Sequence, residues 1–245
     1  MTSTSPLEST VPLYLAGLRL EGKRCLIVGG GAVAARKLRP LLEAGARVTV
    51  VAPALGRQLR ESEPVHPASD AADAADRGGR HRGGWRWIAR AFRAEDVQGQ
   101  MLVFAATDDA ALNEQIGRTA AAAGALANLA TSPEASDFHV PSAFRRGSLQ
   151  VGVLTGGRAP ALAASLRREL EARVGEEWEE VVEVLGEFRD SLTEQNADQE
   201  SRQELNRELA HMDIAGLLAK GGVDAVRSAV QDRLRQGETR PEPCA

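Results

Sequence analysis

Short apolar runs alternate with longer segments of helical periodicity in the first part of the chain. Arg24–Val28 is apolar and stops at three glycines. Residues 32–44 then carry apolar side chains at helical spacing, and Gly45 stands where a helix C-cap belongs. Arg47–Val51 is rich in β-branched residues, as strands are. This order predicts a βαβ unit with a right-handed crossover.

The same alternation continues to residue 130. Strand character returns at 87–89 and in the apolar run 101–106, and Leu126–Leu129 is a further short strand. Residues 107–109 offer N-cap side chains for a helix that ends at Gly124. Strands that alternate with helices predict an open, parallel α/β sheet.

The pattern changes after residue 130. Residues 138–144 and 149–154 flank a turn at 145–148, which predicts an antiparallel hairpin. From residue 160 to about 236 the chain is helical or polar. Two apolar stripes in this region indicate packing against neighbouring helices. The stripes are Leu162, Leu166 and Leu170, and then Trp178, Val181, Val182 and Leu185.

Four parts follow from this reading, namely a sheet domain (1–130), strands (131–158), a helical domain (159–236) and a polar tail (237–245). Within the first part, residues 65–84 lack periodic apolar side chains and are dense in Gly, Ala, Asp and Arg. They predict a solvated insertion.

Composition excludes several classes of protein. Of the 245 residues, 43% are hydrophobic and 26% charged, which is typical of a soluble globular chain. No apolar run reaches the roughly 18 residues of a membrane span, and no secretory signal is visible. Cys25 and Cys244 are the only cysteines and favour no disulfide, so the cytoplasm is the expected location. The net charge of −4 argues against general nucleic-acid binding.

The strongest local motif lies between the first strand and the first helix. Gly29 permits a tight turn, Gly31 leaves the backbone open to a pyrophosphate, and Ala34 allows close packing of helix on strand. The N–H groups of the first helical turn, around Ala32 and Val33, would face the phosphates. The motif predicts a dinucleotide-binding, Rossmann-type domain, although a tight turn without ligand has the same local pattern.

The end of the second strand does not distinguish NAD from NADP. Candidate cofactor-binding residues here are Ala52, Pro53 and Ala54, and Thr107 after a later strand is another. The carboxylate that usually binds the adenosine ribose is missing. Arg57 can meet a 2′-phosphate or lie on the surface.

A second glycine-rich turn precedes a helix that begins near Pro160. Thr155, Gly156 and Gly157 create a nest of backbone N–H groups with the cation of Arg158 beside it. The plain interpretation is a strand-to-helix turn, and the sharper one is a site for an anionic ligand. The four histidines show no ligand spacing, so no dedicated metal site is expected.

Several segments in order resemble the precorrin-2 dehydrogenase and sirohydrochlorin ferrochelatase family, of the siroheme-synthase N-terminal type. They are LIVGGGAVAARK, VTVVAP, FAATDDAALN, NLATSPEASDFHVPS and VGVLTGGRAPALAASLR. The resemblance covers roughly residues 11–190 and implies a stand-alone form without a methyltransferase module. It implies a Rossmann domain, a strand-rich dimerisation region and a C-terminal helical domain.

The resemblance also implies a function. Such proteins are homodimers that use NAD to convert precorrin-2 to sirohydrochlorin, and some insert iron. The substrate carries eight carboxylates, which suits the turn at 155–158 and Arg158. Arg145 and Arg146 can add to this site, and Asn128 is a further substrate-binding candidate.

One position departs from the family. Thr131 stands where the family has its catalytic aspartate, and a hydroxyl is a poor general base near neutral pH. Asp108 or Asp137 can take the proton instead, although Asp108 also fits a helix cap and Asp137 a structural role. A further alternative is that the dehydrogenation needs little help from a base. Otherwise the chain is a non-catalytic tetrapyrrole-binding protein or an NAD(H) sensor.

Overall fold

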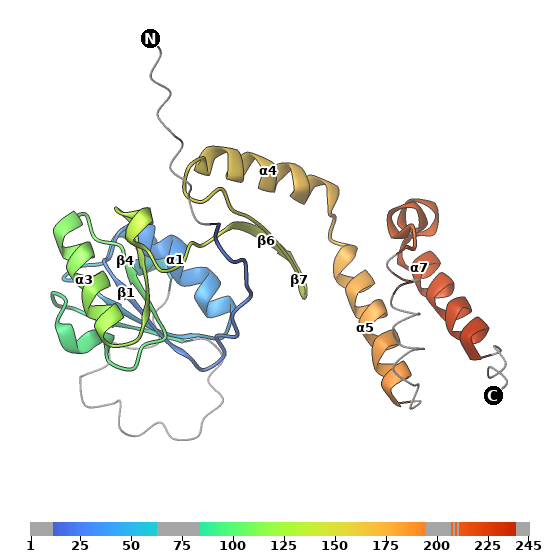
Figure 1. Ribbon diagram of the computed structural model, residues 1–245, viewed down its shortest axis with the longest axis horizontal. Coiled ribbons are helices and arrows are strands. Elements are labelled where there is room, and N and C mark those ends of the chain that lie inside the picture. The colour runs from blue at the N-terminus through green and yellow to red at the C-terminus, as the bar shows by residue number, and fades with distance from the viewer. Residues whose placement is uncertain (1–11, 63–83, 195–206, 208, 210, 239–245) are drawn as a thin grey trace, which may run out of the picture. The chain divides into compact units, whose positions relative to one another are not determined.

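The chain is divided into two compact units, which are described one at a time. A computed structural model describes residues 12–62, 84–194, 207, 209 and 211–238 (Figure 1). The first unit extends through Val140 and includes Gly156–Arg158. The second contains Pro141–Thr155 and the chain from Ala159 onward. The first unit is thus about ten residues longer than the sheet domain predicted from the sequence.

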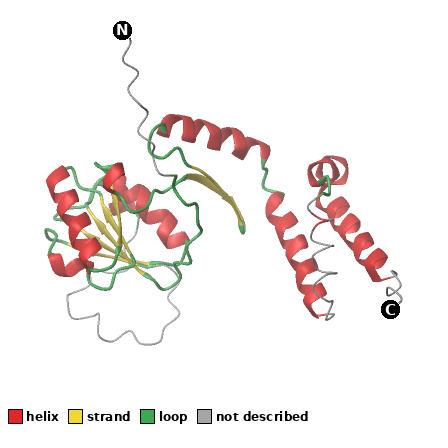
Figure 2. Ribbon diagram, in the orientation of Figure 1, coloured by secondary structure: helices red, strands yellow, loops and turns green. Residues whose placement is uncertain are grey.

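A five-stranded parallel sheet forms the centre of the first unit. Its strands are β1 (Arg24–Val28), β2 (Arg47–Val51), β3 (Trp85–Ile88), β4 (Leu102–Ala105) and β5 (Leu126–Leu129). The strand order is β3-β2-β1-β4-β5, so the switch point of the sheet lies between β1 and β4. Figure 2 shows the strands of this unit as a layer with helices on either side. Open α/β sheets bind ligands beyond the carboxyl ends of their strands at such a switch point. The predicted Rossmann-type sheet is confirmed.

Helices cover both faces of this sheet, and an apolar core lies on each face (Figure 1). The helical elements are α1 (Ala32–Glu43), α2 (Arg57–Glu61), the 3-10 turn η2 (Ala94–Val97) and α3 (Ala110–Ala122). On one face Leu38 and Leu41 of α1 pack on alternate strand residues such as Ile27. On the other face Ile116 of α3 packs on residues such as Leu26. Packing in these two cores holds α1 and α3 on opposite faces, and each helix begins near the carboxyl ends of the strands.

The outer edge of β5 is covered by the chain that follows it. After the 3-10 turn η3 (Pro133–Ala135), the N–H of Asp137 donates to the Ala127 carbonyl at 2.9 Å. The N–H of Leu129 donates to Ser136 Oγ at 2.9 Å. These bonds satisfy backbone groups that an edge strand would otherwise leave open. They also explain why the predicted strand at 138–144 begins later than expected.

A hairpin and a helix begin the second unit. The strands β6 (Ser142–Arg146) and β7 (Leu149–Val153) are antiparallel, and α4 (Pro160–Arg173) packs against both. The predicted hairpin is confirmed, with a turn shortened to two residues. Gly147 has a φ of 54°, which suits a tight hairpin turn.

Two longer helices share the second core. Helices α5 (Trp178–Glu194) and α7 (Ile214–Glu238) bury Val181 and Val184 against Val226 and Val230. The C-terminal helical region is therefore confirmed. Of the stripe predicted from Trp178 onward, Val181 is buried in this core and Trp178 and Leu185 pack against it, whereas Val184 takes the place expected for Val182.

The leucine stripe of α4 behaves differently from its prediction. Leu162, Leu166 and Leu170 are 54%, 40% and 38% exposed, whereas Ala163 is the buried residue of this helix. The packing predicted for these leucines is absent from the described chain. The predicted insertion at 65–84 and the tail at 237–245 lie outside the described residues, apart from their terminal positions. Among the described helices, none is long and apolar enough to cross a membrane.

Candidate functional site

The turn between β1 and α1 requires glycine at its first position. Gly29 has a φ of 123°, and a Cβ there would lie 2.2 Å from the carbonyl oxygen of Ala106. Its N–H donates to the carbonyl of Val51 at 2.9 Å. The turn is therefore held between the ends of β2 and β4, and no side chain fits at Gly29.

The second glycine was not singled out by the sequence analysis. A Cβ on Gly30 would lie 2.0 Å from the carbonyl oxygen of Ala54. The N–H of Gly56 donates to the Gly30 carbonyl at 2.8 Å. Gly30 thus packs directly on the loop after β2. The signal for this role was the unbroken run of three glycines.

Gly31 differs from its two neighbours, because a Cβ there would meet no atom within 4 Å. It is the N-cap of α1, no side chain caps this end, and the first turn holds no acidic residue. The N–H groups of Ala32, Val33 and Ala34 therefore lack the usual side-chain acceptors. An uncapped helix N-terminus with open space before it fits a phosphate, since its partial charge is positive. These residues fit a dinucleotide.

The loop after β2 lies beside this turn. Ala52 is buried, and its carbonyl accepts a hydrogen bond from the indole N–H of Trp87 at 2.9 Å. Pro53 and Ala54 are exposed. No carboxylate is present at this strand end to bind a ribose. Arg57 forms an exposed ion pair with Glu61 at 2.7 Å, so its guanidinium already has a partner.

A buried amide connects the loops that follow β4 and β5. Asn113 of α3 is fully buried, and its Oδ1 accepts hydrogen bonds from the N–H of Thr107 at 3.1 Å and from its hydroxyl at 2.7 Å. Its Nδ2 donates to the Thr107 carbonyl at 3.0 Å and to Thr131 Oγ1 at 3.2 Å. Two residues predicted from the sequence, Thr107 and Thr131, are thus brought together by one that was missed. A lone polar residue on the apolar face of a predicted helix was the available signal.

The two aspartates after β4 have different roles. Asp109 is the N-cap of α3, and its Oδ1 accepts a hydrogen bond from the N–H of Leu112 at 3.0 Å. Asp108 is exposed, and within the described residues its carboxylate forms no hydrogen bond or ion pair. Helix capping therefore accounts for Asp109 and leaves Asp108 available for chemistry.

Asp137 and Asn128 are both engaged by the backbone at the edge of the sheet. Asp137 Oδ2 accepts a hydrogen bond from the N–H of Ala127 at 2.8 Å. Asn128 Nδ2 donates to the Phe138 carbonyl at 2.9 Å. Each side chain helps to hold residues 136–138 beside β5. Their local role is structural, and this favours Asp108 over Asp137 as a candidate base.

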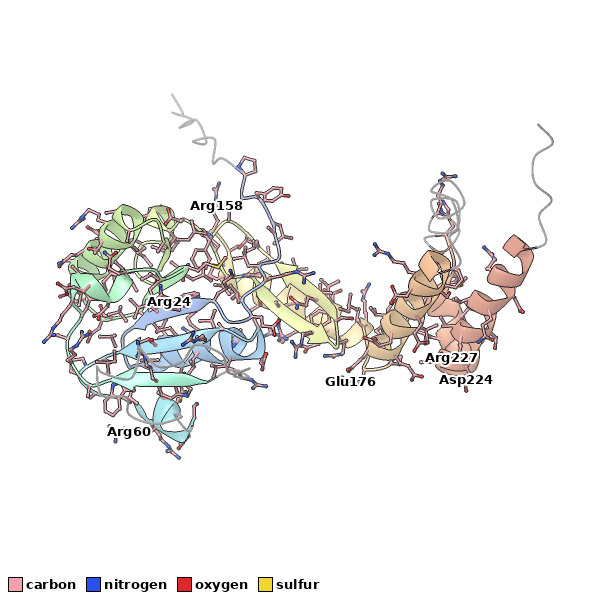
Figure 3. All side chains as sticks on the ribbon, turned by 90° about the horizontal axis from the view of Figure 1, so that it is seen from below. Arg24, Arg60, Arg158, Glu176, Asp224 and Arg227 are labelled. Carbon is pink, nitrogen blue, oxygen red and sulfur yellow. The ribbon has the colours of Figure 1, made fainter. Side chains whose placement is uncertain are left out.

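The glycine-rich turn before α4 has the predicted backbone form. Gly156 and Gly157 have φ values of 60° and 78°. Thr155 Oγ1 accepts a hydrogen bond from the N–H of Ala159, and Pro160 is in the first turn of the helix. Arg158 is exposed and has no ion pair with any described residue (Figure 3). The turn therefore presents a free cation close to the start of a helix.

The hairpin arginines differ in availability. Arg146 is 13% exposed, lies over the ring of Phe144 and forms ion pairs with Glu171 at 3.9 Å and Glu176 at 3.4 Å. Its charge therefore has two carboxylate partners inside the second unit. Arg145 is exposed.

A half-buried lysine and a buried cysteine complete the electrostatics of the first unit. Lys37 Nζ lies 5.7 Å from the centroid of the Phe104 ring, and burial, together with the charge of Arg36, lowers the pKa of Lys37. Burial raises the pKa of the Cys25 thiol to about 11, so this thiol is not a nucleophile. Among the described residues, no three His, Cys, Asp or Glu side chains gather to hold a metal ion.

The comparisons with known proteins agree with this geometry. Residues 16–142, just over half of the chain, match a family model described as "Putative NAD(P)-binding". The chain belongs to this NAD(P)-binding family. Residues 146–173, which contain β7 and α4, match a second model, the sirohaem biosynthesis protein central domain. The NAD(P)-binding model includes both the α1 turn and the Asn113 network.

Curated relatives of this NAD(P)-binding chain include siroheme synthases. The protein from Tolumonas auensis is 34% identical over 92% of the chain, and siroheme synthase 1 from Aeromonas salmonicida is 36% identical over 90%. The chain spans 44% of the length of each. The solved structure of SirC, a precorrin-2 dehydrogenase, matches with a TM-score of 0.65 and 24% identity, over 93% of this chain and all of that one. The fold is therefore the one that SirC has.

Proposed function

We propose that the chain is an NAD-dependent precorrin-2 dehydrogenase that produces sirohydrochlorin. The observation that carries this proposal is the uncapped N-terminus of α1, with open space at Gly31. The siroheme synthase relatives and the structural match to SirC support a tetrapyrrole as the substrate. NAD rather than NADP is proposed from the family resemblance, because the exposed ion pair of Arg57 with Glu61 is too weak to discriminate between the two cofactors.

The residues divide the chemistry between binding and proton transfer. The N–H groups at the start of α1 hold the pyrophosphate, and the loop at 52–54 lies beside the adenosine end. When bound beside these residues, NAD would supply the hydride acceptor for the substrate carbon. Asp108 takes the accompanying proton, because it is exposed at the carboxyl end of β4 and has no partner among the described residues. Arg158 binds a carboxylate of the substrate.

A homodimer is part of the proposal. The exposed leucines of α4 give this helix an apolar face, and a second copy of the chain can cover it. The two-stranded sheet of β6 and β7 also leaves strand edges that a dimer can protect. The dimer follows from the resemblance and from these surfaces together.

A second function is favoured by one observation. Thr131 replaces the family's aspartate, and a chain without a base can still bind a tetrapyrrole and deliver it. In that case the protein binds NAD and sirohydrochlorin but reduces no NAD. Iron insertion remains a prediction of the resemblance alone.

The test is an anaerobic assay that mixes the protein with precorrin-2 and either NAD or NADP and records NADH or NADPH formation. We expect turnover with NAD. Asp108→Asn should slow turnover by roughly 10²–10⁴-fold, the usual worth of a general base. Asp109→Asn, at the neighbouring cap, is the matched control and should retain the wild-type turnover. Tetrapyrrole binding without NAD reduction would establish the carrier function instead.

A further inference from the structure

The buried amide of Asn113 has a single possible orientation. The backbone N–H of Thr107 can only donate, and it lies 3.1 Å from one terminal atom of the Asn113 amide, which must therefore be the oxygen. Turning the amide over would set its NH₂ group against that N–H. The nitrogen consequently faces the other two partners, the Thr107 carbonyl at 3.0 Å and Thr131 Oγ1 at 3.2 Å.

This orientation determines how Thr131 bonds. Because Asn113 Nδ2 must donate, Thr131 Oγ1 accepts, and the hydroxyl proton of Thr131 has no acceptor among the described residues. A hydroxyl whose oxygen already accepts a hydrogen bond becomes a stronger donor. Thr131 is exposed, whereas Asn113 is fully buried and cannot reach a ligand itself. Position 131 therefore offers a donor.

The position of Thr131 directs that donor toward a ligand. It follows β5, whose Leu129 pairs with Ala105 at the end of β4. One residue beyond the end of β4, the carbonyl of Ala106 lies against Gly29 of the dinucleotide turn. The hydroxyl thus lies at the carboxyl edge of the sheet, just after the strand that neighbours β4. Ligands of open α/β sheets bind at this edge.

We infer that Thr131 is a substrate-binding residue that donates a hydrogen bond to a carboxylate of the tetrapyrrole, and that Asn113 is its positioning residue. This inference rests on the proposed function. It assigns Thr131 a donor role and leaves the proton to another group, since a hydroxyl is a poor general base near neutral pH. Position 131, where the family has an aspartate, would in this chain bind a carboxylate of the substrate.

Binding and catalysis predict different effects of Thr131→Val, which removes the hydroxyl and retains the shape. A lost hydrogen bond to a charged group should raise KM for precorrin-2, and the dissociation constant for sirohydrochlorin, by about tenfold. Turnover at saturating substrate and its pH profile should be unchanged, because the lost hydrogen bond stabilises the bound substrate and the transition state equally. Thr131→Ser retains the donor and should resemble the wild type. NAD affinity, measured by calorimetry, should be the same in all three proteins.

Asn113 is tested through its coupling to Thr131. Asn113→Ala should weaken sirohydrochlorin binding in the wild-type background and add little in the Thr131→Val background. If Asn113→Ala does not fold, the comparison of Thr131→Val with Thr131→Ser decides alone. Thr131→Asp should bind sirohydrochlorin more weakly than Thr131→Val, because Asn113 would donate to the new carboxylate and hold it ionised against the ligand.

Three results would overturn the inference. The first is turnover that is slower by about 10²-fold or more in Thr131→Val while KM is unchanged, which is the signature of a lost base. The second is turnover that is faster by a similar factor in Thr131→Asp. The third is an equal dissociation constant for sirohydrochlorin in the wild type and in Thr131→Val. That result would overturn the role of Thr131 and leave the proposed function intact. A wild type that binds no tetrapyrrole at all overturns both.

Discussion

At the scale of single residues, glycine stands at three consecutive positions for different physical reasons. Backbone atoms exclude a side chain at Gly29 and at Gly30, whereas Gly31 faces open space. The sequence motif predicted the tight turn and the open approach, because both follow from the known spacing of such motifs. It did not predict the contact of Gly30 with Ala54, since that contact depends on how the loop after β2 folds back.

The difference between these glycines leads to a matched pair of variants. Gly31→Asp should fold normally, because Gly31 has a φ of −86° and aspartate is a favoured N-cap. Its carboxylate would accept the N–H groups of α1 and repel the phosphates. Calorimetry should show NAD affinity lowered on the order of 10- to 100-fold, at about 1.5–3 kcal/mol for a lost charge-assisted bond. Gly30→Ala should instead lower Tm. Unchanged NAD affinity in folded Gly31→Asp would contradict the dinucleotide site.

At the scale of elements, the strands and helices of the first unit were predicted well because their signals are local. An apolar run ended by glycine marks β1, and an aspartate before an apolar helix marks the start of α3. The Asn113 network was not predictable, since it joins side chains 18 residues apart in sequence. The segment 136–138 was also missed as an edge cover, because side chains and loop backbone supply its hydrogen bonds to β5.

The connection between β3 and β4 depends on one ion pair. Arg90 donates to both carboxylate oxygens of Asp96 at 2.6 and 2.8 Å, and the N–H of Arg93 donates at 2.8 Å. Burial alone would raise the pKa of Asp96, but these hydrogen bonds and the positive charges outweigh it and hold the pKa below 3.8. Asp96→Asn should therefore lower the free energy of unfolding by about 1.5–3 kcal/mol near neutral pH.

The sign of the pH dependence follows from the lowered pKa of Asp96. The contribution of this carboxylate is complete above the unfolded pKa, near 3.8, and is lost as the pH falls through the folded value. Urea unfolding should show a constant difference between wild type and Asp96→Asn from pH 5 to 8, and a shrinking one below pH 4. Glu95→Gln, at the exposed neighbour, is the control and should change stability little. A difference that persists undiminished at pH 2 would refute this account.

At the scale of the whole molecule, the second unit shows where a helical pattern is insufficient. The same periodicity predicted packing for the stripe of α5 and for the leucines of α4. Only the α5 stripe packs into a core of the described chain, through Trp178, Val181 and Leu185. Periodicity identifies an apolar face and says nothing about which surface covers it. A partner chain is the physical alternative to a partner helix of the same chain.

The proposed homodimer is tested on this face of α4. Leu166 is 40% exposed in the middle of the stripe, so Leu166→Glu should not disturb the core of its own chain. In a dimer formed through this face, the new glutamate would be a buried charge without a partner, which is strongly unfavourable. Light scattering at micromolar concentration should show a dimer for the wild type and a monomer for Leu166→Glu. The control Ala172→Glu adds the same charge to an exposed position of α4 away from the stripe and should remain dimeric. If Leu166→Glu is as dimeric as the control, the stripe is not the interface, and a monomeric wild type removes the dimer from the proposal.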